Sequence, residues 1–538
     1  MRRSTYVTLI VASATVAALA TGVAVVAQSP DATKPTEAAP LLPKSVLQGP
    51  DFPEALRAFD PQSFIGVGSC AASGCHGGAK PQPGTPHDNA AWRSSYVVWA
   101  TSDPHARAYQ TLSKPEAAAI VRKLDRVAAD KPVSPERDRR CTTCHATANP
   151  TEPALASFAA DGIGCESCHG AAKGWLGEHF LVRSDAPGAT PADVHQEKLR
   201  LEELGMLDTD NLAVQAQTCV RCHVGDRAGP DGVRDMNHDM IAAGHPALNF
   251  EFAAYKRRMP RHWSVPKTDP ERADRERRAW VVGQFASATA AMRLSADRAK
   301  ASLANSTDAA KPNAPHAPWP EFSEYACYRC HHALRSDATS EASAQQKLAL
   351  DRRRRLEDAK LPSTSVGTEL WGTWNAWHFS QLPHLMVKGK PDPSQTLRRG
   401  VNPFLSDDEL RNGADDLSIS AEGYRGGAAL LSAIEPGELT ADRLFVDLAG
   451  AAAAGPLTWD EATQAYLGCV AMYRSRRAAT GKSLNTADDE AGAILKQLHE
   501  ALRFDKPGDR RFNSPANYDR AEVKKLFEKL AAAAREEK

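Results

Sequence analysis

The sequence predicts a mainly α-helical protein of short helices and loops, with a further helical region at its C-terminal end. Apolar residues recur at helical spacing from Leu112 to Val127 and from Glu271 to Ala301. The 538 residues include 35 Gly and 36 Pro, and many of these mark turns between the helical stretches. Aromatic residues make up 7% of the chain, which leaves room in the core for another apolar filler.

Length and charge narrow the class of protein. A chain of 538 residues has room for two or three domains. The formal net charge is zero, whereas a nucleic-acid-binding protein usually has a basic excess. We therefore expect a folded protein with no nucleic-acid partner.

The N-terminus has the pattern of an export signal. Arg2 and Arg3 precede an uncharged, mostly apolar run from Tyr6 to Val26, and small residues before Gln28 offer a cleavage site. The alternative is an uncleaved anchor, because about 20 apolar residues can span a bilayer. We expect a signal peptide or anchor at 1–27, a Pro/Ala-rich linker at 28–60 and a body in the periplasm or another extracytoplasmic space. Membrane association would occur only through the uncleaved segment.

Ten of the eleven cysteines form five pairs, and each pair is followed at once by a histidine. The motifs are Cys70-x4-Cys75-His76, Cys141-Thr-Thr-Cys144-His145, Cys165-Glu-Ser-Cys168-His169, Cys219-Val-Arg-Cys222-His223 and Cys327-Tyr-Arg-Cys330-His331. This pattern is typical of covalent attachment of haem c. Two thiols form thioethers with one porphyrin, and the adjacent imidazole then becomes the proximal ligand of its iron.

Other interpretations explain this pattern less well. Paired cysteines also occur in zinc sites, redox dithiols and disulfide scaffolds, but none of these needs a histidine directly after the second cysteine. The first motif has two extra residues between its cysteines, which bulges the backbone and still lets both thiols reach one ring. Cys469, in an apolar helical stretch, is expected to be a buried free thiol.

The five motifs define a pentahaem body at 61–340, in which short helices and loops surround stacked haems. A C-terminal helical region follows at 341–538. Within it, Thr458-Trp459-Asp460-Glu461 has the capping-box pattern and predicts the start of a helix. Further helices are expected at 491–502 and 520–534.

Twelve histidines remain as possible distal ligands, enough to give every iron a second imidazole. A methionine such as Met236, Met240 or Met259 could serve instead and would raise the potential. An iron with two imidazoles passes electrons and binds no substrate, whereas an iron with an open position could bind a small molecule.

Residues from about 70 to 223 resemble the cytochrome c-552/c-554 family, whose tetrahaem cytochrome c-554 is an electron carrier. The resemblance depends on four blocks in the same order. The first block is the first motif with the later segment Ser102-Asp103-Pro104-His105-Ala106, and the second block is the second motif alone. The third block is the third motif between Gly162-Ile163-Gly164 and Gly170, followed by Gly177-Glu178-His179. The fourth block is the fourth motif.

The resemblance implies particular axial ligands. It implies that His179 ligates the haem of His76 and that His105 ligates the haem of His169. It also implies an open position on the haem of His145, although His87 or His238 could close it here. The expanded first motif, the insert with His87, the fifth motif and the C-terminal half depart from the family.

Outside the resemblance, local sequence suggests the remaining ligands. His245, between Gly244 and Pro246, is favoured for the fourth haem, with His238 in reserve. His378 and His384 lie among aromatic residues and are candidates for the fifth haem, although aromatic core packing explains them equally well. The other histidines, expected to be exposed, are His195, His262, His316 and His499; His332 directly follows a proximal ligand and cannot easily reach the same iron.

The sequence therefore predicts a periplasmic electron carrier with five covalent haems, acting between a donor and an acceptor protein that remain unidentified. One alternative is a haem enzyme acting on a small nitrogen or sulfur compound at the haem of His145. Another is a docking subunit whose C-terminal helices form the interface.

Overall fold

The computed structural model describes residues 61–79, 93–147, 156–180, 190–227, 229, 232–263, 270–307, 321–325, 376–385, 440–455, 457–482, 488–503 and 518–536. The chain divides into two compact units, 1–41 and 42–538, and all of these residues belong to the second. The predicted fold class is confirmed, because the described residues form helices joined by loops, with an isolated antiparallel bridge between Asp226 and Arg234.

The part of the chain with the first four motifs consists of short helices. Its 3-10 helices are η1 (Pro61–Ser63), η2 (Val67–Cys70), η4 (Pro104–Arg107), η5 (Tyr109–Ser113), η6 (Pro135–Arg137) and η7 (Ala156–Asp161). Its α-helices are α4 (Ser95–Ser102), α5 (Pro115–Asp125), α6 (Arg139–His145), α7 (Glu166–His169), α8 (Pro191–Glu203), α9 (Leu212–His223), α10 (His238–Ala243) and α11 (Phe252–Arg258).

The later helices include the longest in the described chain. They are α12 (Pro270–Thr307), η8 (Phe322–Glu324), η9 (Ala376–His378), α15 (Leu382–Leu385), α18 (Ala441–Ala454), α19 (Trp459–Ala479), α20 (Glu490–Leu502) and α21 (Arg520–Glu536). The expected helices at 112–127, 271–301, 491–502 and 520–534 correspond to α5, α12, α20 and α21. Among the described helices, none is long and apolar enough to cross a bilayer.

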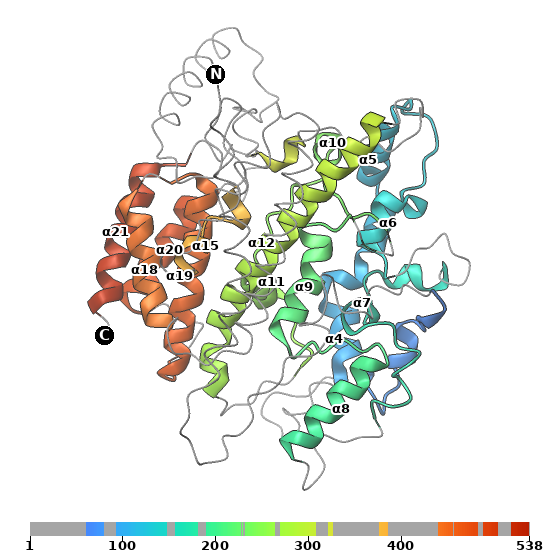
Figure 1. Cartoon of the computed structure of the whole chain (residues 1–538), viewed down its shortest axis with the longest axis horizontal. Coiled ribbons are helices and arrows are strands. Elements are labelled where there is room, and N and C mark those ends of the chain that lie inside the picture. The colour runs from blue at the N-terminus through green and yellow to red at the C-terminus, as the bar shows by residue number, and fades with distance from the viewer. Residues whose placement is uncertain are drawn as a thin grey trace, which may run out of the picture. The chain divides into compact units, whose positions relative to one another are not determined.

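Helix α12 joins the haem-motif part to the C-terminal helices. It packs against α9 on one side and α19 on the other (Figure 1). Trp280 of α12 is fully buried, and Gly468 of α19 lets the two helices approach, because a Cβ there would lie 2.7 Å from the indole. One apolar cluster therefore runs from α9 through α12 into α18–α21.

The predicted capping box starts α19. The Thr458 hydroxyl accepts the backbone N–H of Glu461, and the Glu461 carboxylate accepts the backbone N–H of Thr458 at 2.7 Å. These two bonds satisfy amide groups that have no partner within the helix. Cys469, farther along α19, is a fully buried free thiol, as predicted.

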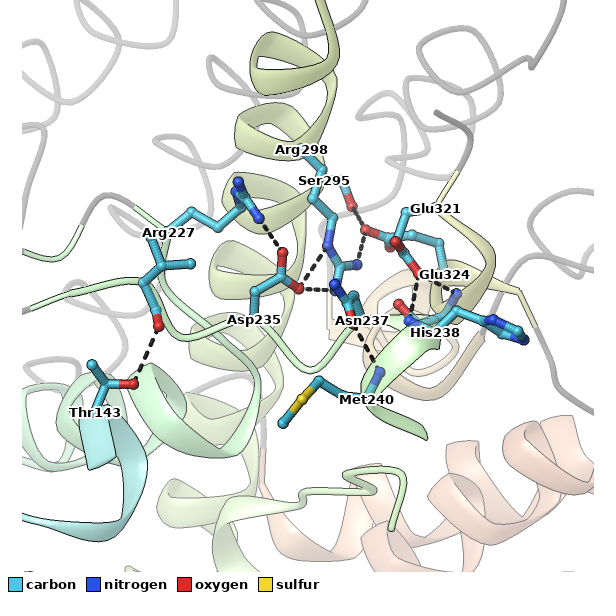
Figure 2. Close-up of polar contacts among 12 residues, drawn as sticks. Thr143, Arg227, Asp235, Asn237, His238, Met240, Ser295, Arg298, Glu321 and Glu324 are labelled. Carbon is cyan, nitrogen blue, oxygen red and sulfur yellow. Dashed lines mark hydrogen bonds and ion pairs between the residues drawn. The ribbon is translucent and has the colours of Figure 1, made fainter. Parts of the chain in front are cut away.

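A buried ionic network fixes the loop after the fourth motif. Arg298 of α12 lies between Asp235, at 2.5 Å, and Glu324, also at 2.5 Å (Figure 2). Glu321 accepts the backbone N–H of His238 at 2.7 Å. The network thus joins α12, the start of α10 and the segment 321–325, which directly precedes the fifth motif in sequence.

Candidate haem sites

Three of the described motifs end a helix at their histidine. His145 is the last residue of α6, His169 of α7 and His223 of α9. In a helix, residues three and four apart share one face, so the two cysteines and the histidine of each motif point to the same side. The local fold therefore presents two thiols and one imidazole together, as attachment of one porphyrin requires.

The first motif reaches a similar arrangement through a turn. Cys70 ends η2, and the two extra residues are taken up in a tight turn where the amides of Cys75 and Gly77 both donate to the Ala72 carbonyl at 2.9 Å. His76 follows directly. The longer spacing is therefore accommodated by a local turn.

Glu166, within the third motif, connects separate segments of the chain through hydrogen bonds. Its carboxylate is buried and accepts the backbone N–H groups of Ile65, Gly66 and Ala172, the last at 2.8 Å. Burial raises the pKa of this carboxyl, and the three hydrogen bonds oppose the rise. Glu166 thus holds the start of the first motif against the third.

Two glycines beside the third motif permit close backbone contacts. Gly162 has φ +65°, and a Cβ there would lie 2.6 Å from the His105 carbonyl oxygen. Gly170 has φ +83°, and a Cβ there would lie 2.2 Å from the Gly205 carbonyl oxygen. Both positions therefore require glycine, which explains much of the sequence block shared with the c-554 pattern.

Each of three proximal histidines faces a second imidazole. A metal–imidazole bond is about 2.0 Å long and the nitrogen lies about 1.1 Å from the ring centre, so two imidazoles on opposite sides of one iron have centres about 6.2 Å apart. The observed centre separations are 6.3 Å for His76–His179, 6.1 Å for His105–His223 and 6.4 Å for His145–His245. These separations match an iron held between each pair.

In three of these histidines the Nδ1 ring nitrogen has a defined hydrogen-bond partner. The Nδ1 atoms of His145, His179 and His245 lie 3.0, 2.7 and 2.9 Å from the carbonyl oxygens of Ala108, Leu176 and Pro246, respectively. An Nδ1–H that donates to a carbonyl leaves Nε2 as the lone-pair nitrogen that can bind iron. The tautomer that haem ligation needs is therefore favoured in both rings of the His145 site.

The protonation states also suit iron. Burial lowers the pKa of His169 and of His223 to about 4 and lowers that of His145 as well. Neutral imidazole is the form that ligates a metal. His105 differs, because its hydrogen bond to Asp103 raises its pKa.

Apolar side chains flank the imidazoles. Phe250 stacks on the His223 ring at 5.0 Å, and Tyr255 meets that ring edge-on at 5.2 Å. Phe180 meets the His179 ring at 5.7 Å. Phe180 is 63% exposed and Tyr255 is 39% exposed, so both offer apolar faces that suit contact with a porphyrin.

The structure pairs two histidines differently from our sequence assignments. His105, which the resemblance assigns to the haem of His169, lies opposite His223. His245, favoured for the fourth haem, lies opposite His145, where the resemblance implies an open position. The assignments differ from these ring pairs because a distal candidate comes from a separate element, and local spacing does not reveal which proximal histidine it lies opposite. His179 does lie opposite His76, as the resemblance implies.

His262, expected to be exposed, is half-buried and lies near His169. Burial is the main cause of the lowered pKa of His169, and the charges of His262 and His76 add to it. The His262 backbone carbonyl accepts the Ser95 hydroxyl at 2.9 Å. The adjacent Trp263 was an available signal, because the same argument from aromatic neighbours selected His378.

The cysteines show which sites adjoin. The Cys70 and Cys165 thiols lie close enough to influence each other's pKa, and so do the Cys144 and Cys222 thiols. Cys168 and Cys219 interact electrostatically. The first site therefore neighbours the third, the third neighbours the fourth, and the fourth neighbours the second.

The remaining candidates lie elsewhere. His378 is on η9, and its Nδ1 is buried without a hydrogen-bond partner; the neighbouring Trp377 donates to the Phe250 carbonyl at 2.8 Å. His384 is half-buried on α15. His195 is half-buried, and His499 is exposed. The positions outside the described residues are His87, His316, Cys327, Cys330, His331 and His332.

Helix-end Cys-x-x-Cys-His motifs with opposed imidazoles at trans-axial separation define the class of c-type cytochromes. Residues 73–170 match the family model of cytochrome c554 and c-prime. This segment, which holds the second and third motifs and part of the first, is therefore similar to cytochrome c554 and c-prime. No curated protein and no solved structure matches it.

Proposed function

We propose that this protein is an exported, periplasmic carrier with five covalent haems that moves electrons between a donor and an acceptor protein. The observation that carries the proposal is the set of three imidazole pairs separated by 6.1–6.4 Å. Iron with two imidazoles is low-spin and has no open position, so it is suited to electron transfer.

The pair His145–His245 favours a carrier over an enzyme. The enzyme alternative needs an open iron at the haem of His145, whereas a 6.4 Å separation from His245 suits a closed one. The His245 Nδ1 lies 2.9 Å from the Pro246 carbonyl oxygen, a geometry that orients the ring for Nε2 ligation.

The contacts between cysteines support a chain of haems. Their order would be the haem of His145, then those of His223, His169 and His76, because neighbouring thiols link the sites in that order. In such a chain the polypeptide fixes spacing and tunes each potential through the axial ligands and their hydrogen bonds.

For the haem of His169, His262 is the distal ligand we propose. For the fifth haem, His238 joins His378 and His384 as a candidate. The His238 ring lies 5.6 Å from that of Phe322, and its amide donates to Glu321 at 2.7 Å. Phe322 precedes Cys327 by five positions in the sequence, so the residue that contacts His238 lies close in chain length to the fifth motif.

Two measurements test the proposal. The mass of the mature protein gives both the haem number and the position of signal cleavage, with five haems and a start near Gln28 expected. A magnetic resonance spectrum should contain low-spin iron alone, and cyanide or nitric oxide should leave the absorption spectrum of the oxidised protein unchanged. Fewer than five haems contradicts the stoichiometry, and a high-spin, cyanide-sensitive iron in the intact protein contradicts the carrier assignment.

A further inference from the structure

Asp103 stands directly behind one axial ligand. Its side chain is 1% exposed, and its Oδ1 accepts the backbone N–H of His105 at 3.0 Å and lies 2.9 Å from the Nδ1 of the same residue. Pro104 occupies the first turn of η4 and has a fixed φ. One carboxylate oxygen therefore both caps the turn and orients the imidazole that faces His223.

This carboxylate partner distinguishes His105 from other ligands. At His145, His179 and His245 the partner of Nδ1 is a backbone carbonyl, which is neutral. A carboxylate draws the Nδ1 proton more strongly, so the ring gains imidazolate character and donates more electron density to its metal. Greater donation favours the ferric over the ferrous state and lowers the reduction potential.

We propose that Asp103 is a positioning and tuning residue that gives the haem of His223 a lower potential than that of the haem of His145. The inference rests on the proposed function, because it assumes that His105 and His223 hold one iron. Within the chain of haems, the haem of His223 lies between those of His145 and His169. A lowered potential at this haem would make electron transfer onto it unfavourable. This step would then limit the rate of electron transfer along the row of haems.

The direct test replaces the carboxylate and measures each haem's midpoint potential. Asp103→Asn preserves shape and removes the charge. We expect the ferric-to-ferrous ratio at one haem to fall at least tenfold at fixed potential, which corresponds to an upward shift of about 59 mV for a one-electron couple. Asp103→Glu, which restores the charge, should recover part of the shift.

Asp519→Asn is a matched control. Asp519 also caps a helix, α21, and its Oδ1 accepts the amide two residues later at 3.0 Å. Loss of a cap alone would act in both variants, whereas the midpoint shift should appear only at position 103. Unchanged midpoints in Asp103→Asn, or an equal shift of all haems, would overturn the proposal.

A second test compares the unmodified protein with the His245→Met variant. The imidazole planes cross at 80° in the pair His105–His223 and at 85° in His145–His245, but at 14° in His76–His179. Crossed planes leave two iron d orbitals nearly degenerate and give a large maximum g value. A redox titration followed by magnetic resonance should thus resolve two such signals. The signal of the haem of His223 is the one that remains in His245→Met, and we expect this ferric signal to disappear at the lower potential. Equal midpoints would refute the tuning role, while absence of both signals would instead refute the ligand pairs.

Discussion

Replacing His245 by alanine removes the imidazole opposite His145 and leaves the rest of the second site in place. His245 is half-buried, and it follows Gly244, whose φ of +122° sets the turn after α10. Helix α10 is held independently, because the Lys123 ammonium donates to the Ala243 carbonyl at 2.9 Å. We therefore expect the local fold to persist, with a loss of unfolding free energy of about 0.5–3 kcal/mol because one iron ligand is removed.

The effect on iron should be large and local. One of five irons would lose its sixth ligand, so about a fifth of the haem should become high-spin. The reduced variant should bind one carbon monoxide per protein. His145 itself should remain bound, because Ala108 and Thr111 hold its Nδ1 at 3.0 and 3.1 Å.

The assay combines magnetic resonance with carbon monoxide titration, and His499→Ala is the control. His499 is exposed on α20 and packs against Tyr466, away from the described motifs. The control should stay low-spin and bind no carbon monoxide. The reasoning is refuted if His245→Ala also stays fully low-spin, or if the unmodified protein already binds carbon monoxide with the same stoichiometry.

Three further outcomes concern stability. Glu166→Ala leaves three buried amides without an acceptor and should cost at least about 3 kcal/mol, measured by denaturant unfolding of the holoprotein. Arg298→Met leaves Glu324 buried without its cation and leaves Asp235 paired with Arg227 alone, and it should cost about 3–5 kcal/mol in the same assay, whereas Arg443→Met, at an exposed pair, should cost less than about 1 kcal/mol. Burial, followed by the charge of Asp208, raises the pKa of Glu202 to about 7. Because the folded pKa is raised, its contribution is present below pH 4 and is lost as pH rises toward 7. Glu202→Gln should therefore flatten the melting-temperature profile between about pH 4 and 7.

Features set by neighbouring residues could be predicted from the sequence, and features set by tertiary contact could not. The capping box at Thr458 needs only residues three apart, and α12 needs only a repeating apolar pattern, so both are correct. The proximal histidines adjoin their cysteines, so their assignment also needs only local sequence, and it stays a prediction. The imidazole that lies opposite His145, in contrast, comes 100 positions later in the chain at His245, where α10 packs against α5.

Glycines and acids near the motifs show why part of the candidate site could nevertheless be predicted from the sequence. Gly162 and Gly170 are required by backbone contacts below 3 Å, so the third block constrains sequence beyond its cysteines. Asp103 belongs to the Asp-Pro-His block that marked His105 as a candidate ligand. The sequence marked the candidate ligand and its turn, but the proximal histidine that it lies opposite could not be predicted without the position of α9.

The described residues before α9 and those from α9 onward differ in how large their apolar clusters are. From α9 onward, one continuous apolar cluster joins α12 to the C-terminal helices. Before α9, two small clusters centre on Leu112 and Val121 and on Ala172 and Trp175, and the first three motifs lie in this part, whereas the fourth motif ends α9. Clusters of that size offset little of the conformational entropy of some 150 residues. Haem attached at Cys70–His223 would therefore supply most of the apolar contact there, so that in this half folding and cofactor binding are one equilibrium, whereas α18–α21 carry a core of their own.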